Sequence, residues 1–279
     1  YRIARRAGHQ GARTEVESQA PVYEKYATGK FLTSNTKLKL LKPKKTMLIS
    51  TFNVRTLNSE KQISELIASA EEHSIDIISI QEHRLYHDDV DIKQHDLPRK
   101  WTLLTSSAWK NSMNSTIGGV GILLSNHALS CLTSIEKISP RIVIANFSGN
   151  PSTTIISCYS PTNVADENDV IHFYEQLSSL ARYIPKHNVT IISGDFNAHL
   201  GQNEKSLFTM YKESNRNGEH LEKFLLESDM YCLNSRFRKK EGKLWTHCHP
   251  NGAKSQIDFL LLNKKWTNSA INCEAYNTF

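Results

Sequence analysis

The feature that most constrains the fold is a set of apolar, β-branched runs that end at, or carry, a polar side chain. The clearest is TIISGDFNAHLG, residues 190–201, in which a strand-like run stops at Asp195 and Asn197. Residues two apart lie on one face of a strand, so both side chains are expected to point the same way from the rim of a sheet. An Asx-rich turn that merely closes the strand is the alternative for this segment alone.

Similar runs recur along the chain. TFNV presents Asn53, SIQE presents Glu82 and SCYSP presents Tyr159, while IDFLLL carries Asp258 inside an apolar strand. Each of the first three has a structural alternative, namely a turn residue, a surface acid and a half-buried aromatic. Asp258 is harder to explain in that way, because a buried carboxylate is costly unless it is paired or hydrogen-bonded.

Periodicity predicts helices between these strands. Residues 59–74 repeat apolar side chains at helical spacing behind a candidate N-cap at Ser59, and 166–184 and 217–230 do the same. Further strands are expected at 46–54, 75–82, 100–109, 117–125, 188–197, 243–247 and 255–263, with a hairpin of 141–147 and 153–161 and a polar loop that ends at Leu97. Without an internal repeat or a linker, residues 46–279 are expected to form one α/β domain.

The net charge of +6 is unevenly distributed. Residues 1–45 hold 11 Lys and Arg against 3 Asp and Glu, a net of +8, so the 34 − 11 = 23 basic and 28 − 3 = 25 acidic residues that remain give the body −2. We therefore expect a basic, disordered tail at 1–45. One basic loop remains in the body, RFRKKEGK, where Arg236, Arg238, Lys239 and Lys240 form either a solvated turn or a contact with a phosphate backbone.

The remaining composition narrows the class of protein. The 5 cysteines form no CxxC pair, which is typical of a reduced, intracellular protein. No apolar run has the length of a membrane span, and no secretory signal is visible. Neither a phosphate-binding P-loop nor a Gly-x-Ser-x-Gly elbow is present.

The polar residues at the strand ends fit one chemistry. Carboxylates bind a hard cation such as Mg²⁺, which takes few protein oxygens together with substrate phosphate. Asn and Tyr can donate hydrogen bonds to phosphate oxygens as charge develops, and an Asp can align or deprotonate water. These residue types therefore favour metal-assisted cleavage of a phosphate ester.

As an ordered set, TFNV, SIQE, CYSP, SGDFN and QIDFLLL resemble the endonuclease/exonuclease/phosphatase family, over roughly residues 46–279. FNVRTL and GDFNAHLG are most similar to the endonuclease domains of RTE-type non-LTR retrotransposons and to craniofacial-development-protein-like chains. The resemblance implies a four-layer α/β sandwich of two mixed β-sheets packed face to face and flanked by helices. It also implies Mg²⁺-dependent (or Mn²⁺-dependent) hydrolysis of DNA in the nucleus, without a small-molecule cofactor or a membrane.

The resemblance also implies roles for single residues. Glu82 would be the main metal ligand with Asn53 beside it, and Tyr159 would contact the phosphate. Asp195 would activate water, Asn197 would bind the phosphate or the transition state, and Asp258 would orient a catalytic histidine. Gly119 and Gly121 match a structural GVG strand in the family.

Two positions depart from the family pattern. The abasic-site endonucleases have an Asp two residues after the first Asn, and Arg55 stands there in this chain. The closing Ser-Asp-His of the family does not follow Asp258, so the domain is expected to be truncated at its C-terminal end, and His247 and His249 precede Asp258 on what is expected to be another loop. A phosphoesterase acting on a small or lipid phosphate, and a catalytically inactive relic, therefore remain as alternatives.

Overall fold

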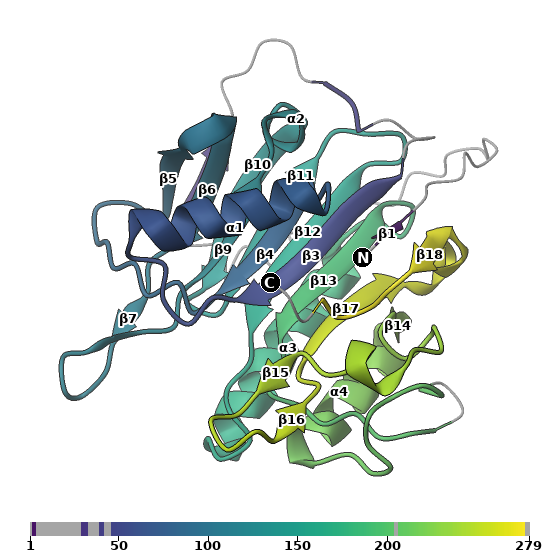
Figure 1. The fold of residues 1–279 in the computed structure, drawn as a ribbon. Coiled ribbons are helices and arrows are strands. Elements are labelled where there is room, and N and C mark those ends of the chain that lie inside the picture. The colour runs from purple at the N-terminus through teal and green to yellow at the C-terminus, as the bar shows by residue number, and fades with distance from the viewer. Residues whose placement is uncertain (1, 4–28, 33–38, 42–45, 204–205, 277–279) are drawn as a thin grey trace.

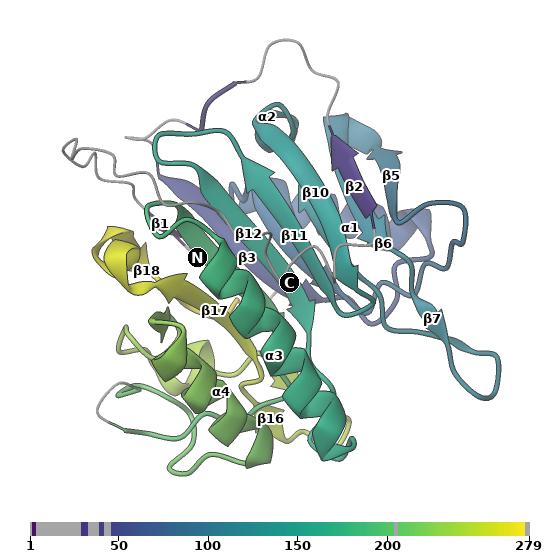
Figure 2. The same ribbon diagram turned by 180° about the vertical axis from the view of Figure 1, so that it is seen from behind.

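Two β-sheets lie face to face between layers of helices in the computed structural model, which describes residues 2–3, 29–32, 39–41, 46–203 and 206–276. Figure 1 shows helix α1 (Glu60–Glu72) across the outer face of one sheet, and Figure 2 shows α3 (Glu167–Tyr183) and α4 (Arg216–Glu227) across the outer face of the other. The predicted four-layer α/β sandwich is confirmed. No helix in the described part of the chain is long and apolar enough to cross a membrane.

The first sheet has seven strands, and both parallel and antiparallel neighbours occur in it. Their order is β18 (Ala270–Asn272), β1 (Arg2–Ile3), β3 (Met47–Asn53), β4 (Ile77–Gln81), β9 (Val120–Leu124), β6 (Trp101–Ser106) and β5 (Ile92–Leu97). The second sheet is also mixed and has seven strands, in the order β14 (Met230–Cys232), β17 (Asp258–Asn263), β13 (Val189–Asp195), β12 (Thr153–Tyr159), β11 (Ile142–Phe147), β10 (Leu132–Ser139) and β2 (Gly29–Leu32).

Two short hairpins stand outside the sheets, β7 (Trp109–Lys110) with β8 (Thr116–Ile117) and β15 (His247–Cys248) with β16 (Lys254–Ser255). Shorter helical turns complete the chain: α2 (Asn126–Leu129), η2 (Pro98–Lys100), η3 (Glu241–Lys243) and η4 (Lys264–Ser269).

Alternation along the strands produces three apolar layers. In β4, Ile77 faces the interior between the two sheets, while Ile78 and Ile80 face α1. In β13, Ile191 faces the interior between the sheets and Ile192 faces α3 and α4. Both strands are fully buried because each has an apolar layer on either side, which explains their near-continuous apolar sequences.

Local sequence signals account for several boundaries. Ser59 caps α1 with a full capping box, since its hydroxyl accepts from the Gln62 N–H while the Gln62 side chain accepts from the Ser59 N–H. Asp166 caps α3 through the backbone N–H of Asn168. At Gly121 an added Cβ would lie 2.6 Å from the Leu104 carbonyl oxygen, so this glycine permits the close approach of β9 and β6.

Two expectations about the elements were wrong, and one strand was not expected. Residues 92–97, expected in a loop, form β5. Strand β10 was not expected at all, and of the strand expected at 243–247 only residue 247 lies in a strand. Within residues 1–45, expected as a disordered tail, β1 pairs with β3 and β18, β2 pairs with β10, and Leu41 is buried, while residues 1, 4–28, 33–38 and 42–45 lie outside the described residues.

Candidate active site

Strand ends from both sheets converge at one edge of the sandwich. β3 and β4 are parallel neighbours, with Asn53 opposite Gln81, and β12 and β13 are parallel neighbours, with Tyr159 opposite Asp195. β17 runs antiparallel to β13 and starts with Asp258 opposite Asp195. Because carboxyl ends of parallel strands share an edge, this topology collects the polar residues in one place.

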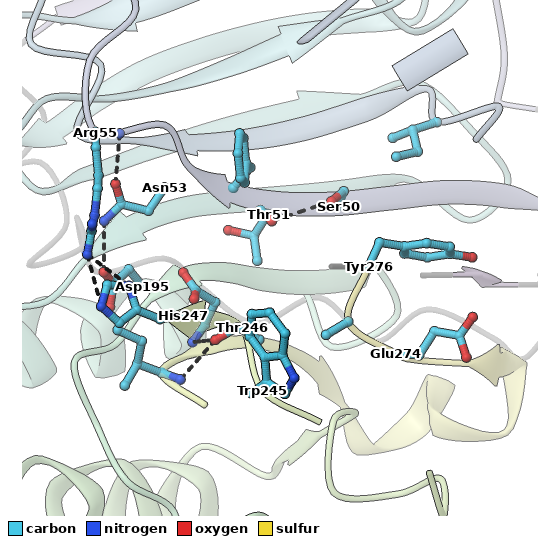
Figure 3. A pocket seen from close by; sticks show the side chains of 15 residues that line it. Ser50, Thr51, Asn53, Arg55, Asp195, Trp245, Thr246, His247, Glu274 and Tyr276 are labelled. Atoms are coloured by element: carbon cyan, nitrogen blue, oxygen red, sulfur yellow. Dashed lines mark hydrogen bonds between the residues drawn. The ribbon is translucent and has the colours of Figure 1, made fainter. Parts of the chain in front are cut away.

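Hydrogen bonds join these residues across the gap between the sheets. The Asn53 side-chain amide donates to Glu82 Oε1 at 2.8 Å. It also donates to Asp195 Oδ2 at 3.0 Å (Figure 3). The Tyr159 hydroxyl donates to Glu82 Oε1 at 3.0 Å. The structure therefore brings together four of the residues expected to act on a phosphate, from β3, β12, β13 and the end of β4.

A polar seam continues from this network into the interior between the sheets. The Ser79 and Ser193 hydroxyls lie 2.6 Å apart, and the Gln81 side chain donates to Ser157 and accepts from Thr51. Sequence reasoning missed these buried residues. The available signal was a polar residue at every second position near the end of otherwise apolar strands, facing the partner sheet.

The backbone conformation at Glu82 and Asn197 sets the directions of their side chains. Both residues adopt left-handed conformations, with φ of 53° and 46°, which are uncommon outside glycine and cluster at functional sites. The Asn197 N–H donates to Asp195 Oδ1 at 2.8 Å, and its side-chain amide donates to the Ser160 carbonyl at 3.0 Å. Since β13 ends at Asp195, strand alternation does not extend to Asn197, and the turn sets its position.

The glycine of SGDFN is needed for packing. A Cβ at Gly194 would lie 1.9 Å from the carbonyl oxygen of Cys158 on neighbouring strand β12. Only glycine therefore permits the close approach of β12 and β13 that sets Tyr159 beside Asp195.

Glu82 is an ionised carboxylate. Burial raises its pKa, but hydrogen bonds from Asn53, Arg84 and Tyr159 and the charge of Arg84 outweigh that effect, so its pKa lies below the ordinary value. Burial and the nearby charges of Glu82 and Asp195 raise the pKa of Tyr159, which keeps the phenol protonated as a hydrogen-bond donor.

Asp195 and Asp258 hold their protons more tightly than ordinary carboxyl groups. Burial raises the pKa of Asp195 to about 6, against hydrogen bonds from Asn53 and from the Asn197 backbone. Burial and the charge of Asp195 raise the pKa of Asp258 well above its usual value, against a hydrogen bond from Thr246. Two close buried carboxylates do not both ionise readily, so Asp195, the stronger acid of the pair, ionises first.

The histidine that Asp258 was expected to orient is absent from the described part of the chain. Asp258 is buried, and its Oδ1 has no hydrogen-bond partner. His247 was expected to lie apart from the site, but the structure brings it into the cleft lined by Asn53, Asp195 and Asp258 (Figure 3).

Sequence reasoning also missed the roles of three arginines at the site. Arg84 forms an ion pair with Glu82 at 3.1 Å. The Arg141 guanidinium lies over the rings of Trp109 and Tyr159, with centroid distances of 4.8 and 5.4 Å, and donates to the Tyr159 carbonyl. Arg55, noted only as a departure from the family pattern, contacts His247.

The expected DNA-binding loop is only partly free. Arg236, Arg238 and Lys240 are exposed, and Arg236 donates to the Asn268 side chain. Lys239 is half-buried and paired with Glu274 at 3.2 Å, so its charge is already compensated.

The donor set at the strand ends fits a hard cation. Among the residues that the structure describes, no group of three or more His, Cys, Asp and Glu side chains is arranged around a metal position. Mg²⁺ needs few protein ligands, however, because it retains water and takes substrate phosphate oxygens. Glu82 supplies an ionised oxygen, and Asn53 would offer its amide oxygen only after its side chain turned over, since that oxygen now accepts from the Arg55 N–H.

The fold, the converging strand ends and the joined carboxylates define a phosphate-ester hydrolase scaffold, and comparison with known proteins identifies the class. The chain belongs to the endonuclease/exonuclease/phosphatase family, whose model matches residues 50–273. The family name covers nucleases and phosphatases, which hydrolyse phosphate esters.

Particular relatives follow from the same comparison. The chain is 28% identical over 236 residues to craniofacial development protein 2 of Bos taurus, covering 79% of this chain and 36% of that protein, so it spans about a third of the relative's length. The fold is similar to a 3′ phosphatase of Neisseria bound to a product DNA hairpin, with a TM-score of 0.56, 17% identity, and coverage of 78% and 87%. An AP endonuclease of Leishmania major has a TM-score of 0.54 at 11% identity, with coverage of 77% and 78%.

Proposed function

We propose that this chain is a metal-dependent endonuclease domain that hydrolyses phosphodiester bonds in DNA. The observation that carries the proposal is the bridge from Asn53 to both Glu82 and Asp195, which joins an ionised carboxylate and a basic carboxylate across the two sheets. Hydrolysis of a phosphodiester needs both kinds of group, since one balances the charge that develops on the phosphate while the other acts on the attacking water. The similarity in fold to the Neisseria 3′ phosphatase bound to a product DNA hairpin and to the Leishmania major AP endonuclease supports DNA as the substrate.

Each side chain has a role that follows from its chemistry. Asp195 accepts a proton from the attacking water, because its pKa of about 6 makes it a carboxylate at neutral pH that is more basic than an ordinary one. Tyr159 stays protonated and donates to an oxygen of the phosphate. Asn197 uses one amide hydrogen on Ser160 and has a second for a phosphate oxygen.

Glu82, together with Asn53, would hold a Mg²⁺ or Mn²⁺ ion. When bound, such an ion polarises a phosphoryl oxygen and offsets charge on the leaving oxygen. For this the Arg84 side chain must release Glu82 Oε2, which it now contacts. The ion pair with half-exposed Arg84 is weak enough to open.

The likeness of FNVRTL and GDFNAHLG to RTE-type retrotransposon endonucleases supports an origin in a mobile element, and a DNA substrate is consistent with a nuclear location. A catalytically inactive domain is the alternative, and the observation that favours it is the buried Oδ1 of Asp258, which has no hydrogen-bond partner among the described residues.

A plasmid-nicking assay tests the proposal. The wild-type chain is expected to nick supercoiled DNA with Mg²⁺ and not with EDTA, and Asp195→Asn is expected to lower the rate about 100-fold or more because the base is lost. Asp229→Asn, at an exposed carboxylate that pairs with Lys264, is the matched control and should nick as the wild type does.

Metal binding is measured independently of activity. Glu82→Gln is expected to weaken Mg²⁺ binding in calorimetry while the protein stays folded. Hydrolysis of inositol phosphates without nicking would favour the small-phosphate alternative, and no hydrolysis of either substrate would establish the inactive one.

A further inference from the structure

Arg55 occupies a position at the site that no step above uses. It lies two residues after the end of β3, is exposed, and lines the same cleft as Asn53, Asp195 and Asp258. Its backbone adopts a left-handed conformation, with φ of 50°, and its N–H donates to Asn53 Oδ1 at 3.1 Å. The loop is therefore fixed to the network, and its side chain extends over the site rather than away from it (Figure 3).

Among the three arginines described at the site, Arg55 is the one whose charge is neither paired with a carboxylate nor covered by aromatic rings. Arg84 is paired with Glu82, and Arg141 is covered by the rings of Trp109 and Tyr159. Arg55 forms no ion pair with any carboxylate of the described residues, although its charge lowers the pKa of both Asp195 and Asp258. A guanidinium within electrostatic reach of two carboxylates, yet bonded to neither, is available to a ligand anion.

His247 supports this guanidinium without neutralising it. Arg55 Nη2 lies 2.9 Å from each of the two ring nitrogens of His247, at the start of β15. Burial and the charge of Arg55 lower the pKa of His247, so the ring is neutral at pH 7 and accepts from the guanidinium. The ring of His249 packs edge-on against His247, with centroids 4.3 Å apart, and supports it from another side. An acidic residue in the place of His247 would cancel the charge that a neutral imidazole leaves available.

We propose that Arg55 binds the anionic oxygens of the phosphodiester that enters the cleft, and that His247 is the positioning residue that holds the guanidinium there. The inference rests on the proposed function, which it deepens by assigning the contact that recognises the phosphate. The planar guanidinium can donate two parallel N–H groups to two phosphate oxygens, a geometry that lysine cannot reproduce.

The contact between Arg55 and the phosphate is tested by removing the charge first from the phosphate and then from residue 55. A short duplex is first nicked by the wild-type chain to map its main position, and the phosphate there is then replaced by an uncharged methylphosphonate. Binding of both duplexes is measured by fluorescence anisotropy in EDTA, so that no cleavage occurs. The wild type is expected to bind the methylphosphonate duplex about 10-fold more weakly, the effect of one charged hydrogen-bonding contact.

Variants separate binding from positioning. Arg55→Ala is expected to bind the natural duplex about 10-fold more weakly and to lose less than about 2-fold on methylphosphonate substitution, because the contact is already gone. For Arg55→Lys, both the affinity for the natural duplex and the methylphosphonate effect should lie between those of the wild type and those of Arg55→Ala. His247→Ala should reduce the methylphosphonate effect, and His247→Gln, a neutral acceptor, should restore much of it. Arg182→Ala, at an exposed arginine on α3, is the charge-matched control and should behave as the wild type does.

The outcomes separate the two proposals. If the wild type nicks the duplex but Arg55→Ala shows the full methylphosphonate effect, Arg55 does not contact that phosphate and this inference is overturned while the endonuclease proposal stands. If the wild type neither nicks nor binds DNA, both are overturned.

Discussion

At the scale of single residues, the site holds buried carboxyl groups whose charged forms are electrostatically unfavourable. Asp195 and Asp258 are buried side by side, and the pKa of Asp195 is raised from 3.8 to about 6. A raised carboxyl pKa means that the native state holds the proton more tightly than the unfolded chain does. Between pH 3.8 and 6 the native state therefore binds more protons, and its stability falls as the pH rises through this window.

Replacing Asp195 by Asn is therefore expected to stabilise the metal-free protein. The gain at pH 7 should be about 1–3 kcal/mol, because a shift of two pKa units corresponds to at most about 3 kcal/mol and the amide loses one acceptor. It should shrink towards pH 4, where the wild-type carboxyl is already protonated. Urea unfolding in EDTA at both pH values measures it, with Asp229→Asn as the exposed control. A variant less stable than the wild type at pH 7 would contradict the assignment of strain to this carboxylate.

The residues that the sequence predicted were those that end strands. Asn53, Glu82, Tyr159 and Asp195 could be found because an apolar run stops beside each of them. Arg84 and Arg141 could not, since an arginine in a loop gives no sign that it will meet a carboxylate or an aromatic ring from another element. His247 was misplaced for the same reason, because its position depends on how β15 folds back onto the site.

At the scale of elements, the two sheets meet through a layer that changes from apolar to polar. Ile77 and Ile191 fill one end of this layer, while Ser79 and Ser193 form a buried hydroxyl pair nearer the site. Such a pair adds little to the free energy of unfolding. Each hydroxyl nevertheless needs the other, because a buried polar group without a partner leaves its full desolvation cost uncompensated.

A double-mutant cycle on β4 and β13 is expected to show this coupling. Ser79→Ala and Ser193→Ala should each destabilise the protein by about 1–3 kcal/mol, whereas the double variant should lie within about 1 kcal/mol of the wild type. Urea unfolding of the four proteins provides the cycle. Additive losses would mean that each serine has a separate partner.

Element prediction succeeded where the pattern was strong. The capping box at Ser59 and the apolar runs of β4, β13 and β17 were sufficient for placement. The edge strand β5 was missed because IKQHDL is mostly polar, since only Ile92 is buried in it. β1 and β2 were missed because their pairing with β3 and β10 depends on residues distant in sequence.

At the scale of the whole molecule, charge is divided between two parts of the chain. Residues 46–279 carry a net of −2 by sequence and place Glu82, Asp195 and Asp258 at the site, so the body does not attract a polyanion by its net charge. The +8 of residues 1–45 is the compensating charge, and it adds to Arg55 and to the exposed part of the loop that contains Arg236, Arg238 and Lys240. If DNA is the substrate, long-range attraction comes chiefly from the tail and contact at the scissile phosphate comes from the body.

Neutralising part of the tail is therefore expected to flatten the salt dependence of DNA binding without changing the chemical step. Changing Arg5, Arg6, Arg13 and Lys25 to Gln, at positions outside the described residues, should reduce the slope of log K against log salt by up to about 3–4, the effect of losing four phosphate contacts. The rate of nicking at saturating protein should stay within about 2-fold of the wild type, because none of these residues belongs to the strand-end network. The matched control changes four lysines of the body that already pair with acids, the exposed Lys61, Lys223 and Lys264 and the partly exposed Lys93. Since these charges are largely compensated, their loss should change the slope much less. Anisotropy titrations of a short duplex at several salt concentrations measure the slopes, and equal slopes for the two quadruple variants would show that the tail has no special part in attracting DNA.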